Sequence, residues 1–152
     1  MSAFSAADYP TDTLEQRVRY ARIRAGLSVT YSAQVIGVNR DYYNLLEKKC
    51  DRINPGILVK ICQLTHADIG WILYGDHQPP AVHLDGDTIG QRIRYFRKTN
   101  GLTIVSVSST VFDVHKVSTF SAWETDRCIP ELRTLMRIAA AYGISAASFI
   151  PT

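Results

Sequence analysis

The sequence has few of the features that mark disulfide-rich, secreted or membrane-spanning proteins. Its three cysteines, Cys50, Cys62 and Cys128, are far apart and form no CxxC pair, which argues against a disulfide framework and favours reduced thiols. No apolar run is long enough to span a bilayer. The first residues contain neither the basic nor the apolar segment of a secretory signal. We therefore expect a cytoplasmic protein without a membrane partner.

The sequence also lacks the motifs of common catalytic, metal and cofactor sites. It has no Gly-rich phosphate loop, and no serine or cysteine stands near histidine and aspartate in a recognisable catalytic pattern. His77 and His83 lie close to aspartates, but in a Pro-containing stretch that does not fix ligands in the geometry a metal ion needs. We expect no metal site, no cofactor and no enzymatic activity.

What the sequence does contain is an internal repeat. Residues 13–28 (TLEQRVRYARIRAGLS) and residues 88–103 (TIGQRIRYFRKTNGLT) share eight identities in sixteen positions, at the constant offset that relates Thr13 to Thr88. A period of this length predicts two small tandem domains. We expect a flexible tail at 1–12, a first domain at 13–75, a linker at 76–87 and a second domain at 88–152.

Both repeats are predicted to be entirely helical. Thr13 and Thr88 are each followed by glutamine three residues later, which is the sequence of a capping box at the start of a helix. Leu14, Val18 and Ala21 have the spacing of one buried helix face, which leaves the arginines of this helix for its remaining faces. Because no convincing β alternation is visible, the expected fold class is all-α.

Each predicted domain is basic. Residues 13–75 hold nine Lys or Arg and five Asp or Glu, and residues 88–152 hold eight and four, so each carries a net charge of +4. The other five acidic residues lie in the tail and the linker. Two basic units suit a polyanionic partner, but an excess of this size is also common on inert surfaces. Charge alone does not decide the function.

Residues 26–47 contain a more specific pattern: Gly-Leu-Ser, a short helix, a Gly37-Val38 turn, and a polar helix that ends in Leu-Glu. This pattern resembles, without a gap, the helix-turn-helix of the Cro/CI-type (XRE) family of phage and bacterial repressors. The resemblance extends from Thr13 to Gly75, because the ending WILYG is similar to the Trp-Leu-Leu-x-Gly ending of many phage repressor domains. It implies two tandem lambda-repressor-like domains of the five-helix type that bind double-stranded DNA.

The resemblance assigns base reading to the third helix. The family's base-reading positions are Arg40, Asp41, Tyr42 and Leu45 here, and Asn44 shares the predicted solvent-facing side. Arginine can form a bidentate contact with guanine, aspartate can accept from a cytosine amine, and leucine can touch a thymine methyl group. Tyr43 and Leu46 are expected to face the core instead.

Other positions of the first domain are expected to contact phosphate or to serve the fold. Arg19, Ser28, Asn39 and Lys48 are the predicted phosphate contacts, and Ser28 and Asn39 also suit helix caps. The family often places a phosphate-binding glutamine at the start of its second helix, where this chain has Val29. That departure predicts a more weakly held half-site.

Two acid–base pairs are assigned a structural role by the same resemblance. In related repressors the positions of Arg22 and Glu47 form an internal ion pair that joins the first and third helices. The second repeat keeps both partners as Arg97 and Glu124. We therefore expect both pairs to be mostly buried and not to act in DNA contact or catalysis.

The second domain is predicted to read DNA less well. Gly101 to Glu124 spans two positions more than Gly26 to Glu47, so two extra residues lie in or near its turn. Lys116, Ser118 and Thr119 are then the candidates for a second DNA contact, on a helix of short side chains. The alternative is a role in dimerisation or in packing between domains. Farther on, DRCIP at 126–130 resembles DRINP at 51–55.

The sequence therefore predicts a sequence-specific transcriptional regulator, a repressor of the phage or mobile-element type that binds an inverted repeat as a homodimer. Half-sites about 10 bp apart, or a multiple of that, and steep salt dependence would follow. The first alternative is a protein-interaction module of the antitoxin or anti-activator type, which the Tyr31, Tyr42 and Tyr43 cluster and the missing glutamine at Val29 would suit. The second is an architectural nucleoid protein with little sequence preference.

Overall fold

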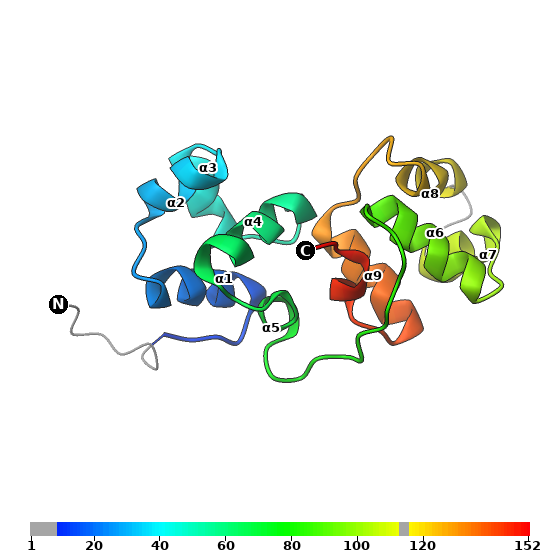
Figure 1. Cartoon of the computed structure of the whole chain (residues 1–152), viewed down its shortest axis with the longest axis horizontal. Coiled ribbons are helices and arrows are strands. Elements are labelled where there is room, and N and C mark those ends of the chain that lie inside the picture. The colour runs from blue at the N-terminus through cyan, green and yellow to red at the C-terminus, as the bar shows by residue number, and fades with distance from the viewer. Residues whose placement is uncertain (1–8, 113–115) are drawn as a thin grey trace. The chain divides into compact units, whose positions relative to one another are not determined.

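The chain folds into two compact helical units. The computed structural model describes residues 9–112 and 116–152, and the chain divides into Met1–Gln78 (unit 1) and Pro79–Thr152 (unit 2). The described residues form nine α-helices and one 3-10 helix and contain no strand, which confirms the all-α prediction. Figure 1 shows helices α1–α5 in unit 1 and α6–α9 in unit 2. Within those residues, no helix is both long enough and apolar enough to cross a membrane.

Unit 1 consists of five helices whose starts are set by local capping. They are α1 (Leu14–Arg24), α2 (Val29–Ile36), α3 (Arg40–Leu46), α4 (Pro55–Thr65) and α5 (Ile69–Tyr74). Thr13 and Gln16 form the predicted capping box of α1. Between α2 and α3, Gly37 adopts φ +90°, a left-handed conformation that strongly favours glycine. The chain can therefore reverse within three residues.

Unit 2 repeats this order with two differences: its last element is a 3-10 helix, and its third and fourth helices are shifted by two positions. Its elements are α6 (Ile89–Thr99), α7 (Ile104–Val111), α8 (Val117–Glu124), α9 (Leu132–Tyr142) and the 3-10 helix η3 (Ala146–Phe149). Helices α6 and α7 follow α1 and α2 at the offset of the sequence repeat, whereas α8 and α9 each begin two positions later than that offset would place them. The two extra residues therefore lie between α7 and α8.

The structure differs from the sequence prediction at two places, the segment 126–130 and the helix cap at Thr88. DRCIP at 126–130 does not occupy the position of DRINP, because Pro55 is the first residue of α4 and Pro130 lies two residues before α9. The capping box predicted at Thr88 is only half formed. Thr88 Oγ1 accepts from the Gln91 amide, but Gln91 Oε1 accepts from the Asp87 amide, one residue earlier than in a capping box.

Each unit has its own apolar core. Unit 1 buries side chains from all five helices, among them Val18, Ala33, Tyr43, Leu58 and Ile72. Unit 2 buries an equivalent set, among them Ile93, Val107, Phe120, Leu135 and Phe149. The third helix of each unit is thus held by a large inward ring, Tyr43 in α3 and Phe120 in α8. The opposite faces of these helices point away from the core.

Most of the segment predicted as a linker packs on unit 2. The units divide after Gln78, and Leu84 is buried. The carbonyl of Pro80 accepts from the Ser145 amide at 2.9 Å, and the amide of Val82 donates to Ser148 Oγ at 3.0 Å. These contacts join segments that are far apart in the sequence, so the Pro and Asp content of residues 76–87 did not reveal them.

Two buried thiols make the stability of unit 1 sensitive to alkali. Burial raises the pKa of Cys50 and that of Cys62 to about 12, from an ordinary value of 9.0. The thiols ionise earlier in the unfolded chain than in the folded one. These two thiols therefore contribute no pH dependence below pH 9, and between pH 9 and about 12 each lowers the free energy of unfolding by about 1.4 kcal/mol per pH unit. Burial also raises the pKa of Tyr43, which adds to the decline above pH 10.

Urea unfolding of the full chain with Trp123→Phe at several pH values, followed by the fluorescence of Trp71, measures this decline. Cys62→Ala should reduce the slope, whereas Cys128→Ser should not, because Cys128 is exposed. An unchanged slope in Cys62→Ala would contradict the assignment.

Candidate functional site

Helix α3 presents polar residues outward because its other face is buried. The side chains of Tyr43 and Leu46 are 0% and 3% exposed and anchor the helix in unit 1. Arg40 and Asp41 in its first turn are exposed, and Leu45 is 52% exposed. Helices α2 and α3 pack against each other, so the outward face of α3 has a fixed orientation within the unit.

The other two predicted base-reading residues are less accessible. Tyr42 and Asn44 are both half-buried. Tyr42 also supplies the backbone amide that is capped by the Asn39 side chain. Of the five residues predicted to read bases, Arg40, Asp41 and Leu45 are therefore the exposed ones.

The four predicted phosphate contacts are all exposed, and two of them also cap helices. Ser28 Oγ accepts from the Tyr31 amide at 3.1 Å, and Asn39 Oδ1 accepts from the Tyr42 amide at 2.7 Å. Capping uses only the oxygen, so the serine O–H and the asparagine NH₂ keep their donor capacity. Lys48 follows α3, and the Arg19 guanidinium lies over the Tyr9 ring at 5.6 Å from its centroid.

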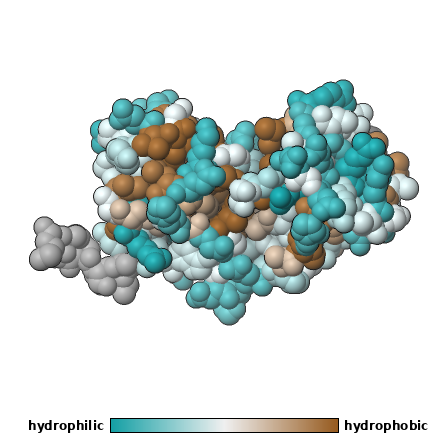
Figure 2. Space-filling model, viewed as in Figure 1, coloured by the Kyte–Doolittle hydropathy of each residue, from teal (hydrophilic) through white to brown (hydrophobic). Residues whose placement is uncertain are grey.

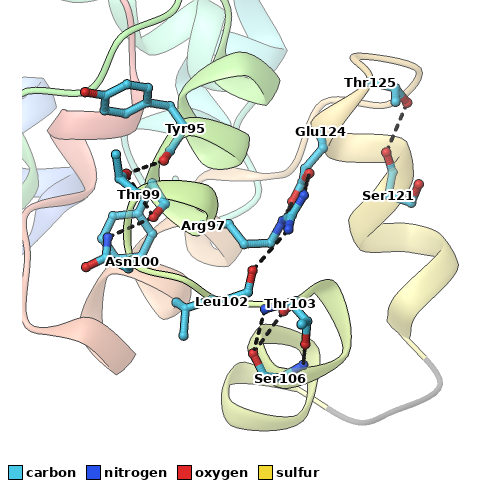
Figure 3. A network of polar contacts seen from close by, with 11 residues as sticks. Tyr95, Arg97, Thr99, Asn100, Leu102, Thr103, Ser106, Ser121, Glu124 and Thr125 are labelled. Atoms are coloured by element: carbon cyan, nitrogen blue, oxygen red, sulfur yellow. Dashed lines mark hydrogen bonds and ion pairs between the residues drawn. The ribbon is translucent and has the colours of Figure 1, made fainter.

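Both units contain an Arg–Glu ion pair between the first and third helices. Arg22 Nε lies 2.8 Å from Glu47 Oε2, with side chains 13% and 8% exposed, and Arg97 Nε lies 2.6 Å from Glu124 Oε2. Each pair is bidentate, because a second guanidinium nitrogen contacts the other carboxylate oxygen at 2.9 Å. The remaining nitrogen of Arg97 donates to the Leu102 carbonyl, as Figure 3 shows.

These contacts have an electrostatic consequence. The hydrogen bond to Glu47 raises the pKa of Arg22 further, and the bond to Glu124 does the same for the pKa of Arg97. The pairs leave both arginines engaged inside their own unit, so they are unsuited to phosphate contact. Without the resemblance, Arg22 looks in the sequence like one more surface arginine of the same helix, as Arg19 and Arg24 are.

One arginine of α1 does not lie where the helix pattern placed it. Arg17 was expected on an exposed face, but it is only 6% exposed. Its Nε donates to the Ile72 carbonyl at 2.7 Å and its Nη2 to the Leu73 carbonyl at 2.9 Å, near the end of α5. Gly75 permits this approach, since a Cβ there would lie 3.3 Å from Arg17 Nη1.

Arg92 has the same role in unit 2. Its Nε donates to the Gly86 carbonyl at 2.9 Å, and its Nη1 contacts the Ser148 carbonyl at 3.2 Å. The shared position of Arg17 and Arg92 in the repeat was visible in the sequence, but it did not show whether these arginines faced solvent or backbone carbonyls. They tie the first helix of each unit to its last element.

The corresponding face of unit 2 carries short side chains. Lys116, Ser118 and Thr119 are exposed, as the sequence comparison requires, and Val117 and Ala122 are half-buried. Lys116 stands at the N-cap of α8 without a side-chain capping bond, where Asn39 caps α3. Apart from Lys116 these side chains are too short to offer the reach of Arg40, and Lys116 lacks the bidentate guanidinium.

Among the described residues, no group of three His, Cys, Asp or Glu side chains is arranged to hold a metal ion. His83 Nε2 lies 2.7 Å from Asp85 Oδ1, but both side chains are largely exposed. An exposed pair of this kind is worth little and defines no site.

The exposed face of α3 combines a cation, an anion and an apolar side chain in a seven-residue helix. Lys48 and Lys49 follow directly and are both exposed; sequence reasoning singled out only the first of them. Such a surface can attract an anion and hydrogen-bond to polar edges. Comparison with known proteins adds no assignment to it, because no family model, no curated protein and no solved structure matches the chain.

Proposed function

We propose that the protein is a sequence-specific DNA-binding transcriptional regulator in which α2, the Gly37 turn and α3 form a helix-turn-helix. The observation that supports this most directly is the exposure of Arg40 and Asp41 on a helix whose inner face is locked by Tyr43 and Leu46. A recognition helix needs this arrangement, because its first residues must reach base edges in the major groove. Arg40 suits guanine O6 and N7, and Asp41 suits cytosine N4.

The resemblance of residues 13–75 to Cro/CI-type repressors supports the same proposal. One such helix reads too few bases for useful specificity, so we infer that the protein binds an inverted repeat of double-stranded DNA as a homodimer in the cytoplasm. Half-sites would be separated by about 10 bp or a multiple of it. We propose a repressor of the phage or mobile-element type.

Selection from a random pool of duplex DNA with the full-length protein at physiological salt tests this proposal. One enriched palindrome with guanine at the Arg40 position is expected. A composite motif with two unlike halves would mean that unit 2 also reads bases, and recovery of unselected DNA would favour an architectural protein.

Arg40→Ala gives the most specific test, because it removes the proposed base contact and should not change the fold. Affinity for the selected site should fall by about 1–3 kcal/mol, roughly 5- to 150-fold, while affinity for unrelated DNA changes little. Lys48→Ala is the matched control. It should lower the affinity for both DNAs by the same factor and reduce the slope of log affinity against log salt by about one. Equal loss on both DNAs in Arg40→Ala would contradict base reading.

A protein-interaction module is the second candidate, and one observation favours it. Three apolar side chains of α2 and α3 are about half exposed: Tyr31 at 50%, Val35 at 52% and Leu45 at 52%. Figure 2 shows hydrophobic surface over this part of unit 1. A stoichiometric protein partner that copurifies with the chain and is lost in Val35→Lys, with no DNA selected, would support this function instead.

A further inference from the structure

A cavity in unit 2 has a lining unlike that of a packing defect. It encloses about 460 Å³, within the range of small-molecule sites, and lies between the end of α7, the outer side of α8 and the start of α9. Two aromatic rings, Phe112 and Trp123, form part of its wall, with centroids 5.7 Å apart. Thr119 and Thr134 add hydroxyl groups that can donate or accept.

The described lining of this cavity carries positive charge. Lys116, Arg133 and Arg137 line it, and the described lining includes no acidic side chain. Glu131 lies beside it and pairs with Arg133 at 3.1 Å, but both of these side chains are about half exposed. The Arg137 guanidinium lies over the Phe112 ring, 4.9 Å from its centroid, so a cation and an aromatic face meet at the wall.

Unit 1 has different side chains at the same positions. When α8 is aligned with α3 and α9 with α4 at their first residues, Tyr42 corresponds to Thr119 and Gly56 to Arg133. Thr119 is smaller than Tyr42 and therefore leaves room beside α8. Arg133 places a cation where unit 1 has Gly56. Arg137 corresponds to Lys60, so this position carries a positive charge in both units. The cavity is therefore a property of the second repeat and not of the fold.

We propose that this cavity binds a small anion attached to a flat aromatic ring, such as a nucleoside monophosphate or an aromatic carboxylate. Lys116 and Arg137 would hold the anionic group, and the ring would pack on the indole of Trp123. The polar face of Thr119 and Thr134 would hydrogen-bond to the remaining edge. A duplex DNA backbone fits less well, because it offers phosphates without an accessible ring.

The position of Trp123 supplies a direct readout. The chain has two tryptophans, Trp71 in unit 1 and Trp123 in the cavity wall, so Trp71→Phe leaves one reporter. Titration with adenosine 5′-monophosphate should change Trp123 fluorescence and saturate near or below about 1 mM. Adenosine alone, inorganic phosphate alone and 4-hydroxybenzoate separate the contributions of ring and anion. Calorimetric titration of the unsubstituted chain repeats the measurement without the Trp71 change.

Variants distinguish the cavity from general anion binding. Arg137→Gln and Lys116→Gln should each weaken nucleotide binding at least ten-fold, whereas Lys60→Gln, the unit 1 equivalent of Arg137, and Arg40→Ala should leave it unchanged. The proposal is overturned if no saturation occurs, if Arg137→Gln binds as tightly as the unsubstituted chain, or if inorganic phosphate binds as tightly as the nucleotide. A response to a DNA duplex but not to the nucleotide would also overturn it, in favour of a backbone contact.

Discussion

Arg22→Ala should destabilise unit 1 by about 3–5 kcal/mol, because it leaves the carboxylate of Glu47 buried without its partner. The pair is bidentate and both side chains are less than one-seventh exposed, at 13% and 8%. The Arg22 Nη1 bond to the Leu27 carbonyl, at 2.9 Å, is lost as well. A loss of this size is a large part of the stability of a small domain.

Urea unfolding in a Trp123→Phe background, followed at Trp71, measures this effect in unit 1, and the Trp71→Phe background leaves Trp123 to report unit 2. Arg97→Ala should show the converse, with the loss in unit 2. The double variant Arg22→Ala/Glu47→Ala should be less destabilised than the two single losses combined, since no charge is left unpaired. If Arg22→Ala had the same free energy of unfolding as the unsubstituted chain and lost only the proposed DNA binding, the structural role of the pair would be wrong.

Arg17→Ala should lower the free energy of unfolding by about 2–4 kcal/mol, because the buried carbonyls of Ile72 and Leu73 lose their hydrogen-bond donors. Burial lowers the pKa of Arg17, so the protein holds this guanidinium in spite of a desolvation penalty. The expected damage is centred on α5 and its attachment to α1. Hydrogen exchange should therefore rise first at residues 69–75.

Exposed arginines of the same helix provide the control for Arg17. Arg19→Ala and Arg24→Ala change surface side chains and should alter stability by less than about 0.5 kcal/mol. Arg17→Lys should recover only part of the loss, since an ammonium is a single point charge and does not reproduce the planar guanidinium fork. Equal stability of Arg17→Ala and Arg19→Ala would rule out this account of α5.

Much of the helical framework could be predicted because its signals are local. Thr13, Ser28 and Asn39 each cap a helix through an amide three residues away, so residue type and spacing contain the whole interaction. The repeat predicted two units for a similar reason, since equal patterns of caps and apolar residues form equal helices. The resemblance to a known family added the Arg22–Glu47 and Arg97–Glu124 pairs, whose partners are 25 and 27 residues apart.

Tertiary structure alone decided the features that depend on distant partners. Arg17 meets carbonyls 55 and 56 residues away. Its position between Leu14 and Ala21 puts it beside the buried face of α1, unlike Arg19, but nothing in that helix shows which carbonyls it contacts. The 76–87 stretch looked like a linker because Pro and Asp suit loops, yet Leu84 and two hydrogen bonds hold most of it on unit 2. The basic cavity arises where α7, α8 and α9 meet, so its cations come from segments whose proximity only the packing of the helices establishes.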